Sequence, residues 1–172
     1  MDTIKDKGPK VFAVSGVKNS GKTTLIEKIV GKLNGLNYKV GVIKHDGHEF
    51  VADHEGTDTD RHKKAGAKSV MIYSNTKMML IKDCQKIQIE ELIQYQKDMD
   101  IVIVEGMKYS NLPKIEIVRG EISSQCVCAK DTLLAVVTDL AVENIDVPVV
   151  GLDDIDRLLE IIEEKILLKD RY

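Results

Sequence analysis

The chain has 172 residues, a length that suits one domain with a substantial core. Apolar residues make up 43% of it and charged residues 31%, which is typical of a soluble globular protein. A net charge of −3 and an aromatic content of 4% argue against a nucleic-acid partner, and the longest apolar runs have the length of strands, so no membrane-spanning segment is expected.

The three cysteines, Cys84, Cys126 and Cys128, do not have the spacing of a disulfide framework. The N-terminus lacks the apolar core of a signal peptide. Both features favour reduced thiols and a cytoplasmic location. Cys126 and Cys128 form a single C-x-C, which is more typical of ordinary packing than of a metal site.

The first strong signal follows a polar lead-in at residues 1–9, which is expected to be frayed. The apolar run Lys10–Ser15 predicts a central parallel strand. It leads into G-V-K-N-S-G-K-T, and a helical pattern comes next, so the motif is a phosphate-binding P-loop in its required context. Gly16 and Gly21 allow a tight turn and a close approach of the backbone to an anion.

The P-loop predicts a set of nucleotide contacts. Lys22 would reach the β- and γ-phosphates, and the Thr23 hydroxyl would ligate Mg²⁺. The predicted nucleotide-binding residues of this stretch are Gly16, Lys18, Asn19, Ser20, Gly21, Lys22, Thr23 and Thr24.

Elements of both kinds follow the P-loop. A helix with one apolar stripe ends near Asn34-Gly35, and the run Lys39–Lys44 predicts a second strand. The stripe consists of Leu25, Ile26, Ile29, Val30 and Leu33. A polar stretch leads to a short helix that begins at Thr57, with Thr57 and Asp60 as a capping box. The segments Ser69–Tyr73 and Met78–Lys82 predict a hairpin.

The second strong signal is D-I-V-I-V-E-G at residues 100–106, after a helix that ends near Lys97. Four consecutive β-branched residues predict a buried strand, and Glu105 follows at its carboxyl end. In P-loop proteins this placement supplies a carboxylate to Mg²⁺ or to its bound water.

The remaining elements complete an α/β pattern. Strands are predicted at Lys114–Val118, Leu133–Thr138 and Val147–Gly151, and a closing helix at Asp153–Leu168 with Asp153 or Asp154 as its cap. The predicted fold is a single P-loop domain over residues 1–172. It has a mostly parallel sheet flanked by helices, and the hairpin adds antiparallel strands.

All four histidines, His45, His48, His54 and His62, lie within eighteen residues. Their density raises three alternatives: a transition-metal site, a loop that senses nucleotide or Mg²⁺ or binds a second substrate, and a merely solvated loop. The spacing matches no common zinc pattern. Because the loop follows the second strand, it is expected at the carboxyl edge of the sheet, near the nucleotide.

Three blocks of the sequence carry a resemblance to a known family. They are G-V-K-N-S-G-K-T-T-L-I-E-K, then V-I-K-H-D-G-H-E-F with the later G-T-D-T-D-R-H, then D-I-V-I-V-E-G-M-K. Over residues 11–108 the chain resembles the molybdopterin-guanine dinucleotide biosynthesis protein B (MobB) family. The resemblance implies a P-loop fold, GTP with Mg²⁺ as ligands, weak hydrolysis at most, and a homodimer. It further implies an adaptor for the guanylyltransferase that joins GMP to molybdopterin, with molybdopterin or its guanine dinucleotide as a further ligand.

The resemblance also implies site residues. Glu105, Gly106 and Lys108 match the family's second motif, usually E-G-F-K, in which Met107 replaces the aromatic residue. The residues that fall in its middle motif are Lys44, His45, Asp58 and Arg61.

Phosphoryl transfer needs positioned charge, which Lys22 and Mg²⁺ would supply, with Arg61 or Lys108 as a third source. The catalytic candidates are therefore Lys22, Glu105 and Arg61. No water-positioning glutamine is evident, which fits slow hydrolysis. Asp139 ends a late strand, and we hypothesise that it recognises guanine; the alternative is an ordinary strand-ending aspartate.

Two other functions compete with the adaptor. A small-molecule kinase that uses ATP fits the length and the P-loop, but the arginines are too dispersed for an Arg-rich lid. A metal-handling GTPase of the nickel-chaperone sort is suggested by the histidines.

Overall fold

The computed structural model describes residues 8–142 and 145–168. Two compact units are distinguished: one runs up to His45 and resumes at Leu92, and the other is Asp46–Glu91. The lead-in predicted at residues 1–9 lies, up to residue 7, outside the described residues.

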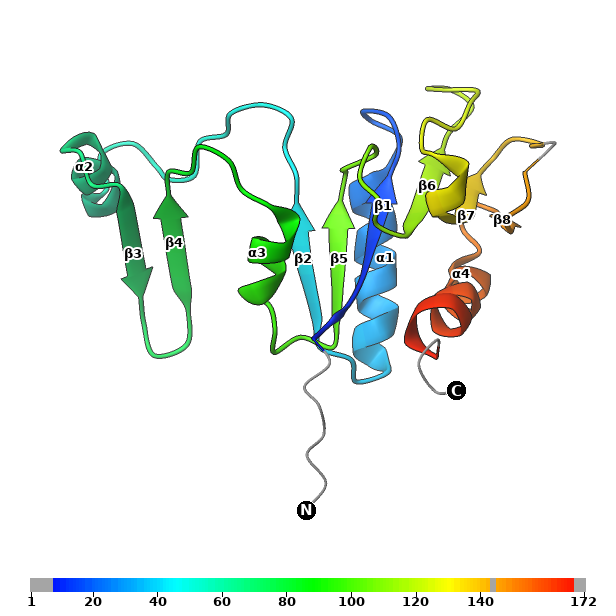
Figure 1. Cartoon of the computed structure of the whole chain (residues 1–172), viewed down its shortest axis with the longest axis horizontal. Coiled ribbons are helices and arrows are strands. Elements are labelled where there is room, and N and C mark those ends of the chain that lie inside the picture. Colours follow the sequence, from blue (N-terminus) through cyan, green and yellow to red (C-terminus); the bar gives the residue numbers. More distant parts are fainter. Residues whose placement is uncertain (1–7, 143–144, 169–172) are drawn as a thin grey trace, which may run out of the picture. The chain divides into compact units, whose positions relative to one another are not determined.

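The first unit contains a six-stranded sheet with the order β2-β5-β1-β6-β7-β8 (Figure 1). Every pair of neighbouring strands is parallel. The strands are β1 (Lys10–Ser15), β2 (Val40–Lys44), β5 (Ile101–Glu105), β6 (Lys114–Val118), β7 (Leu133–Thr138) and β8 (Val149–Val150). All five residues of β5 are buried, as expected for a central strand that is covered on both faces. The predicted parallel sheet is confirmed.

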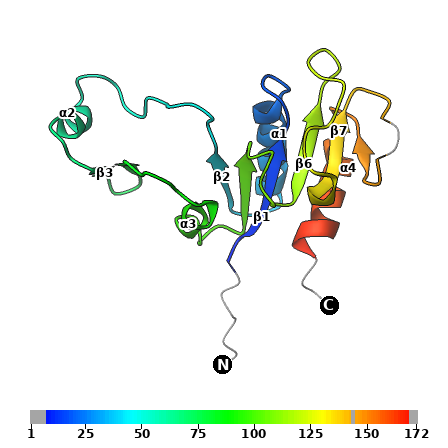
Figure 2. The ribbon, with the colours of Figure 1, turned by 45° about the horizontal axis from the view of Figure 1, so that its top comes forward.

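Two helices pack against one face of this sheet (Figure 2). They are α1 (Lys22–Gly35) and α4 (Ile155–Ile162), and α4 continues as a π-helical turn, Glu163–Leu167. The predicted stripe of α1 lies in the core, where Ile29 and Leu33 are fully buried. Asp154 caps α4, because its carboxylate accepts from the backbone N–H of Arg157 at 3.2 Å.

The opposite face buries two charged side chains of β6, Lys114 and Glu116. The Glu116 carboxylate accepts from the backbone N–H groups of Val127 at 2.6 Å and Cys128 at 3.1 Å. The Lys114 ammonium donates to the carbonyls of Ser110 and Leu112. Both charges are thus hydrogen-bonded, as buried polar groups require, and they tie the loops on either side of β6 to the sheet.

The strand order places a topological switch point at β1. The chain leaves β1 through α1 towards β2 on one side, whereas β6, β7 and β8 lie on the other. In open α/β sheets, ligands bind outside the carboxyl ends of the strands at such a point. The P-loop follows β1 at this position.

The second unit contains α2 (Asp58–Lys64) and an antiparallel ribbon of β3 (Ser69–Tyr73) and β4 (Met78–Lys82). Thr57 caps α2, because its hydroxyl accepts from the N–H of Asp60 at 3.2 Å. The predicted capping box is only half formed, since the Asp60 carboxylate accepts from the N–H of Gly56 instead.

A third helix, α3 (Ile89–Gln94), ends earlier than the sequence predicts. The N–H groups of Tyr95 and Gln96 bond to carbonyls three residues back, so the last turn tightens and the α-helix stops. No helix within residues 8–142 and 145–168 is long and apolar enough to cross a membrane.

Candidate nucleotide-binding site

The P-loop connects β1 to α1 through three residues with positive φ. Gly16, Asn19 and Gly21 have φ values of 143°, 65° and 97°. A Cβ at Gly16 would lie 2.5 Å from the carbonyl oxygen of Ile117, so only glycine fits there. This backbone leads into the N-terminus of a 14-residue helix, whose free N–H groups suit an anion.

The predicted phosphate-binding residues lie at different depths in this loop. Lys18 and Asn19 are exposed at its tip, and Thr24 is exposed in the first turn of α1. Ser20 is buried, and its hydroxyl donates to the carbonyl of Val17 at 2.9 Å. The Ser20 side chain therefore supports the loop from within.

The Lys22 side chain folds back over the loop. Its ammonium donates to the carbonyl of Val17 at 2.6 Å and lies 3.4 Å from that of Gly16. Burial lowers the pKa of Lys22, and the Glu105 carboxylate opposes this shift. A cation spanning the loop in this way is placed to meet a bound phosphate.

Glu105 and Thr23 meet at the base of the loop. The Thr23 hydroxyl donates to Glu105 Oε1 at 3.1 Å, and the Lys44 ammonium lies 3.4 Å from the same oxygen. The Glu105 side chain is only 10% exposed. A hydroxyl and a carboxylate are ligands that Mg²⁺ prefers, so this pair fits the predicted metal. The structure brings Lys22, Thr23, Lys44 and Glu105 together.

The turn after β5 joins this group through its backbone. Gly106 and Met107 have positive φ values of 97° and 49°. The Gly106 N–H donates to the carbonyl of Val14 at 2.9 Å, and the His45 N–H donates to that of Glu105 at 3.0 Å. The turn is therefore fixed against β1 and against the end of β2.

Three lysines give the site a positive field. The charges of Lys44 and Lys108 both contribute to lowering the pKa of Lys22, after the larger effect of burial. Lys108 also lies over the Tyr109 ring, with 5.0 Å between the ammonium and the ring centroid. Several cations around one carboxylate suit a polyphosphate with its metal.

Asp139 follows β7 at the same edge of the sheet. Its side chain is exposed, and Oδ1 accepts from the backbone N–H of Gly120 at 2.7 Å. One oxygen of Asp139, the residue predicted to recognise guanine, thus already accepts a hydrogen bond, although each carboxylate oxygen has two acceptor positions.

A cavity of about 200 Å³ lies beside the start of α1. Its lining residues are Gly21, Thr24, Leu25, Lys28, Ile117, Arg119, Leu152 and Asp153. Arg119 is not among the site residues that the sequence predicts. The signal that could have found it is its position directly after a strand, at the carboxyl edge that also carries Glu105.

The other predicted site residues belong to the second unit. Arg61 Nη1 lies 3.7 Å from Asp58 Oδ1, and both side chains are exposed. The side chains of His48, His54 and His62 are exposed as well. Within the described parts of the chain, no three His, Cys, Asp or Glu side chains are grouped as metal ligands.

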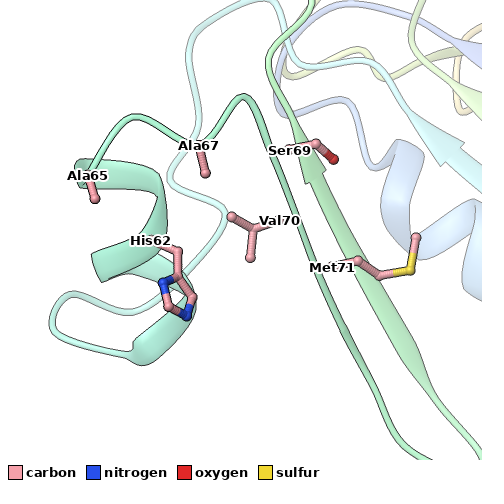
Figure 3. Close-up of a pocket in the computed structure, with 6 residues that line it drawn as sticks. All are labelled: His62, Ala65, Ala67, Ser69, Val70 and Met71. Carbon is pink, nitrogen blue, oxygen red and sulfur yellow. The ribbon is translucent and has the colours of Figure 1, made fainter.

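A hollow of about 500 Å³ also lies in the second unit (Figure 3). Its lining residues are His62, Ala65, Ala67, Ser69, Val70 and Met71. Although it is larger than the cavity at α1, no lysine or arginine is among these lining residues, so the hollow does not suit a phosphate.

The fold and the site define a P-loop nucleotide-binding protein. The family model described as molybdopterin guanine dinucleotide synthesis protein B (MobB) matches residues 11–139. The chain therefore belongs to the MobB family, which confirms the resemblance and supports neither the kinase nor the nickel-chaperone alternative.

Individual relatives agree with this membership. A molybdopterin-guanine dinucleotide biosynthesis adapter protein of Haemophilus influenzae is 31% identical over 156 residues, which are 89% of this chain and 87% of that protein. The protein of the same description from Escherichia coli is 26% identical over 162 residues, 90% and 91% of the two chains. The crystal structure of Bacillus subtilis MobB matches with a TM-score of 0.71 at 26% identity, over 88% of this chain and 97% of that one.

Proposed function

We propose that this chain is a GTP-binding adaptor in the formation of molybdopterin guanine dinucleotide. In this role it assists the guanylyltransferase that joins GMP to molybdopterin, and it hydrolyses GTP weakly at most. The observation that carries the proposal is the contact between Thr23 and Glu105 under a P-loop, in a family whose relatives are described as adapter proteins of this pathway.

In the proposed complex the phosphates lie on the backbone N–H groups of the P-loop. Thr23 and Glu105 would hold Mg²⁺, which would neutralise phosphate charge there. Lys22 reaches the β- and γ-phosphates, while Lys44 and Lys108 add positive charge at the rim. This group of side chains suits a bound triphosphate. We expect weak hydrolysis, because the sequence offers no evident glutamine that would orient the attacking water.

Residues of the middle motif are proposed to contact the phosphoryl group that is transferred or the second ligand of the protein. Arg61 would supply charge to the phosphoryl transition state, and Asp58, which lies 3.7 Å from it, would orient its guanidinium. Molybdopterin, or its guanine dinucleotide, is the proposed second ligand. His45 follows β2 and is exposed, so its imidazole is free to take part in the same contacts.

Asp139 is proposed to recognise guanine. A carboxylate can accept from the N1–H and the exocyclic amine of that base, and Oδ2 remains for this contact while Oδ1 binds the Gly120 N–H. The variant Asp139→Asn is expected to lose the preference for GTP over ATP. An unchanged affinity for GTP and an unchanged preference over ATP and XTP would exclude this role.

The main proposal is tested with Lys22→Ala, because this ammonium bridges the loop without contributing to the apolar core. Calorimetry with GTP, ATP and molybdopterin, each with and without Mg²⁺, should show Mg²⁺-dependent GTP binding that the variant loses. The matched control is Lys32→Ala on the same helix, whose ammonium pairs with Asp156 at 2.6 Å at the surface. Normal GTP affinity in Lys22→Ala would refute the P-loop assignment.

The adaptor role needs a separate assay. Addition of the wild-type chain should raise the yield of guanine dinucleotide formed by the guanylyltransferase from molybdopterin and GTP, and Lys22→Ala should not. No effect of a wild-type chain that binds GTP would refute the adaptor role while leaving nucleotide binding in place.

The homodimer is proposed to form through the ribbon of β3 and β4. Met71, Ile72, Tyr73 and Met78 are between 51% and 80% exposed, and both edges of the ribbon are unpaired within the structure as described. A two-stranded ribbon is marginal by itself, and exposed apolar patches mark interfaces. Ile72→Glu should give a monomer in sedimentation velocity. The control Leu36→Glu, at a position of similar exposure, should not change the mass.

A cytoplasmic location is proposed together with these roles. All three cysteines are free thiols, as a reducing compartment allows.

A further inference from the structure

Arg119 follows β6 directly and lies against the P-loop. Its Nη2 atom is 3.4 Å from the position that a Cβ on Gly21 would take. Its Nε is buried and has no hydrogen-bond partner in the described residues. Because an unpaired buried donor is costly, this guanidinium is not fully satisfied by its contacts in the described residues.

Among residues 8–142 and 145–168, no carboxylate forms an ion pair or hydrogen bond with this guanidinium. Asp153 is near enough that Arg119 contributes, after Lys28, to the lowered pKa of its carboxyl. The ion pair of Asp153, however, is with Lys28, at 2.8 Å. Arg119 is thus a cation that lines the cavity at α1 beside an acid that is already paired.

The cavity at α1 has the size and chemistry for one part of a nucleotide. Its volume of about 200 Å³ is below the roughly 300–1,000 Å³ of sites that enclose a whole drug-sized ligand. Leu25, Ile117 and Leu152 provide apolar surface. Thr24, which follows the P-loop lysine by two residues, also lines the cavity. Gly21 and Thr24 line the cavity, so it adjoins the residues that the motif assigns to the phosphates.

We propose that this cavity receives the nucleoside half of the P-loop nucleotide, and that Arg119 contacts that half and not the β- and γ-phosphates. A guanidinium suits this role because it can stack on a flat base and donate to ribose oxygens. The Gly120 N–H donates to Asp139, so the residue proposed to recognise guanine is hydrogen-bonded to the neighbour of Arg119 in the chain. The inference rests on the proposed nucleotide-binding function.

The test compares Arg119→Gln with the wild-type chain against three ligands: GTP, GDP and inorganic tripolyphosphate, all with Mg²⁺. Affinities are read by competition with a fluorescent GTP analogue. We expect GTP and GDP to bind about 10-fold more weakly to the variant, the loss typical of one hydrogen bond to a charged group. Tripolyphosphate, which has no nucleoside, should bind with unchanged affinity. The control Arg157→Gln alters an exposed arginine that pairs with Glu160 and should change none of the three.

Two results would overturn the inference alone. In the first, Arg119→Gln binds GTP as the wild-type chain does. In the second, it loses tripolyphosphate and GTP to the same extent, which would assign Arg119 to the phosphates or to the loop itself. A wild-type chain that binds neither GTP nor tripolyphosphate would instead overturn the nucleotide function and this inference with it. Arg119→Lys, which keeps the charge without the planar fork, replaces the glutamine variant if the latter does not fold.

Discussion

Replacing Glu105 with glutamine separates the metal role of this residue from its structural role. The carboxylate accepts from the Thr23 hydroxyl at 3.1 Å and lies 3.4 Å from the Lys44 ammonium. Glutamine keeps the size of the side chain and an oxygen that can accept from Thr23, but it loses the charge. We therefore expect Glu105→Gln to reduce the Mg²⁺ dependence of GTP binding while the fold stays intact.

The magnitude follows from the loss of one charge-assisted contact. Such contacts contribute about 1.5–3 kcal/mol, so GTP affinity in Mg²⁺ should fall by about 10- to 150-fold. In EDTA, Glu105→Gln should leave the GTP affinity equal or higher. Without the metal ion, the wild-type Glu105 carboxylate repels the triphosphate, and the variant lacks this repulsion. The ion pair with Lys44 is half exposed and contributes about 0–1 kcal/mol, so Tm should fall by less than about 4 °C.

The assay is calorimetric titration of GTP at millimolar Mg²⁺ and in EDTA. Its control is Asp100→Asn, which removes an acid next to the opposite end of the same strand, where Asp100 Oδ2 accepts from the Lys39 N–H at 2.7 Å. Asp100→Asn should keep the wild-type ratio of the two affinities. If Glu105→Gln keeps that ratio as well, the carboxylate does not hold the metal and the assignment of Glu105 is wrong.

Three further predictions concern other parts of the chain. Glu116→Ala leaves the buried N–H group of Cys128 and the partly buried N–H group of Val127 unpaired and should lower the free energy of unfolding by about 2–5 kcal/mol in urea titrations, whereas the exposed Glu121→Ala should have little effect. Burial raises the pKa of Cys128 to about 12, so its thiolate is scarce at pH 8, and iodoacetamide should label the exposed Cys84 first; mass spectrometry that finds Cys128 labelled first would contradict this. Thr57→Ala removes the cap of α2 and should cost about 1 kcal/mol, measured as faster amide exchange in that helix; unchanged exchange would show that the cap is dispensable.

The parts of the fold that could be predicted are those in which local sequence and burial agree. The apolar runs of β1 and β5 are long enough to specify central strands, and the P-loop fixes its own turn through Gly16 and Gly21. The ends of short strands are predicted less accurately from the sequence. β8 has only two paired residues, Val149–Val150, where the sequence suggested five, because pairing with β7 rather than composition determines where that strand stops.

Other features depend on contacts that no local pattern encodes. The alternation of K-I-E-I-V predicts a strand, but it does not show that Lys114 and Glu116 are buried, because their cover comes from loops outside the strand. Arg119 follows the same strand and is one of several arginines that are dispersed along the sequence. Its position against Gly21 depends on β6 pairing with β1, which is a long-range contact.

The middle motif shows how a functional pattern in sequence can have a structural component. Asp53 accepts from the hydroxyls of Thr57 and Thr59, and these bonds lower the pKa of its carboxyl. Asp60 accepts from the Gly56 N–H at 2.8 Å and pairs with Lys64 at 2.9 Å. Much of the polar density at residues 53–64 thus folds the loop and starts α2.

The separation of residues that hold the loop from those that do not leaves fewer candidates for ligand contacts within the middle motif. Asp58 and Arg61 are exposed and bonded only weakly to each other, so a ligand can recruit them at little cost to the loop. Asp53 and Asp60, by contrast, are engaged in bonds that hold the backbone. Substitution of Asp53 should therefore change the stability of the second unit, whereas substitution of Arg61 should act on function without changing stability. An Arg61 variant that is destabilised as much as an Asp53 variant would show that the two residues serve the loop alike.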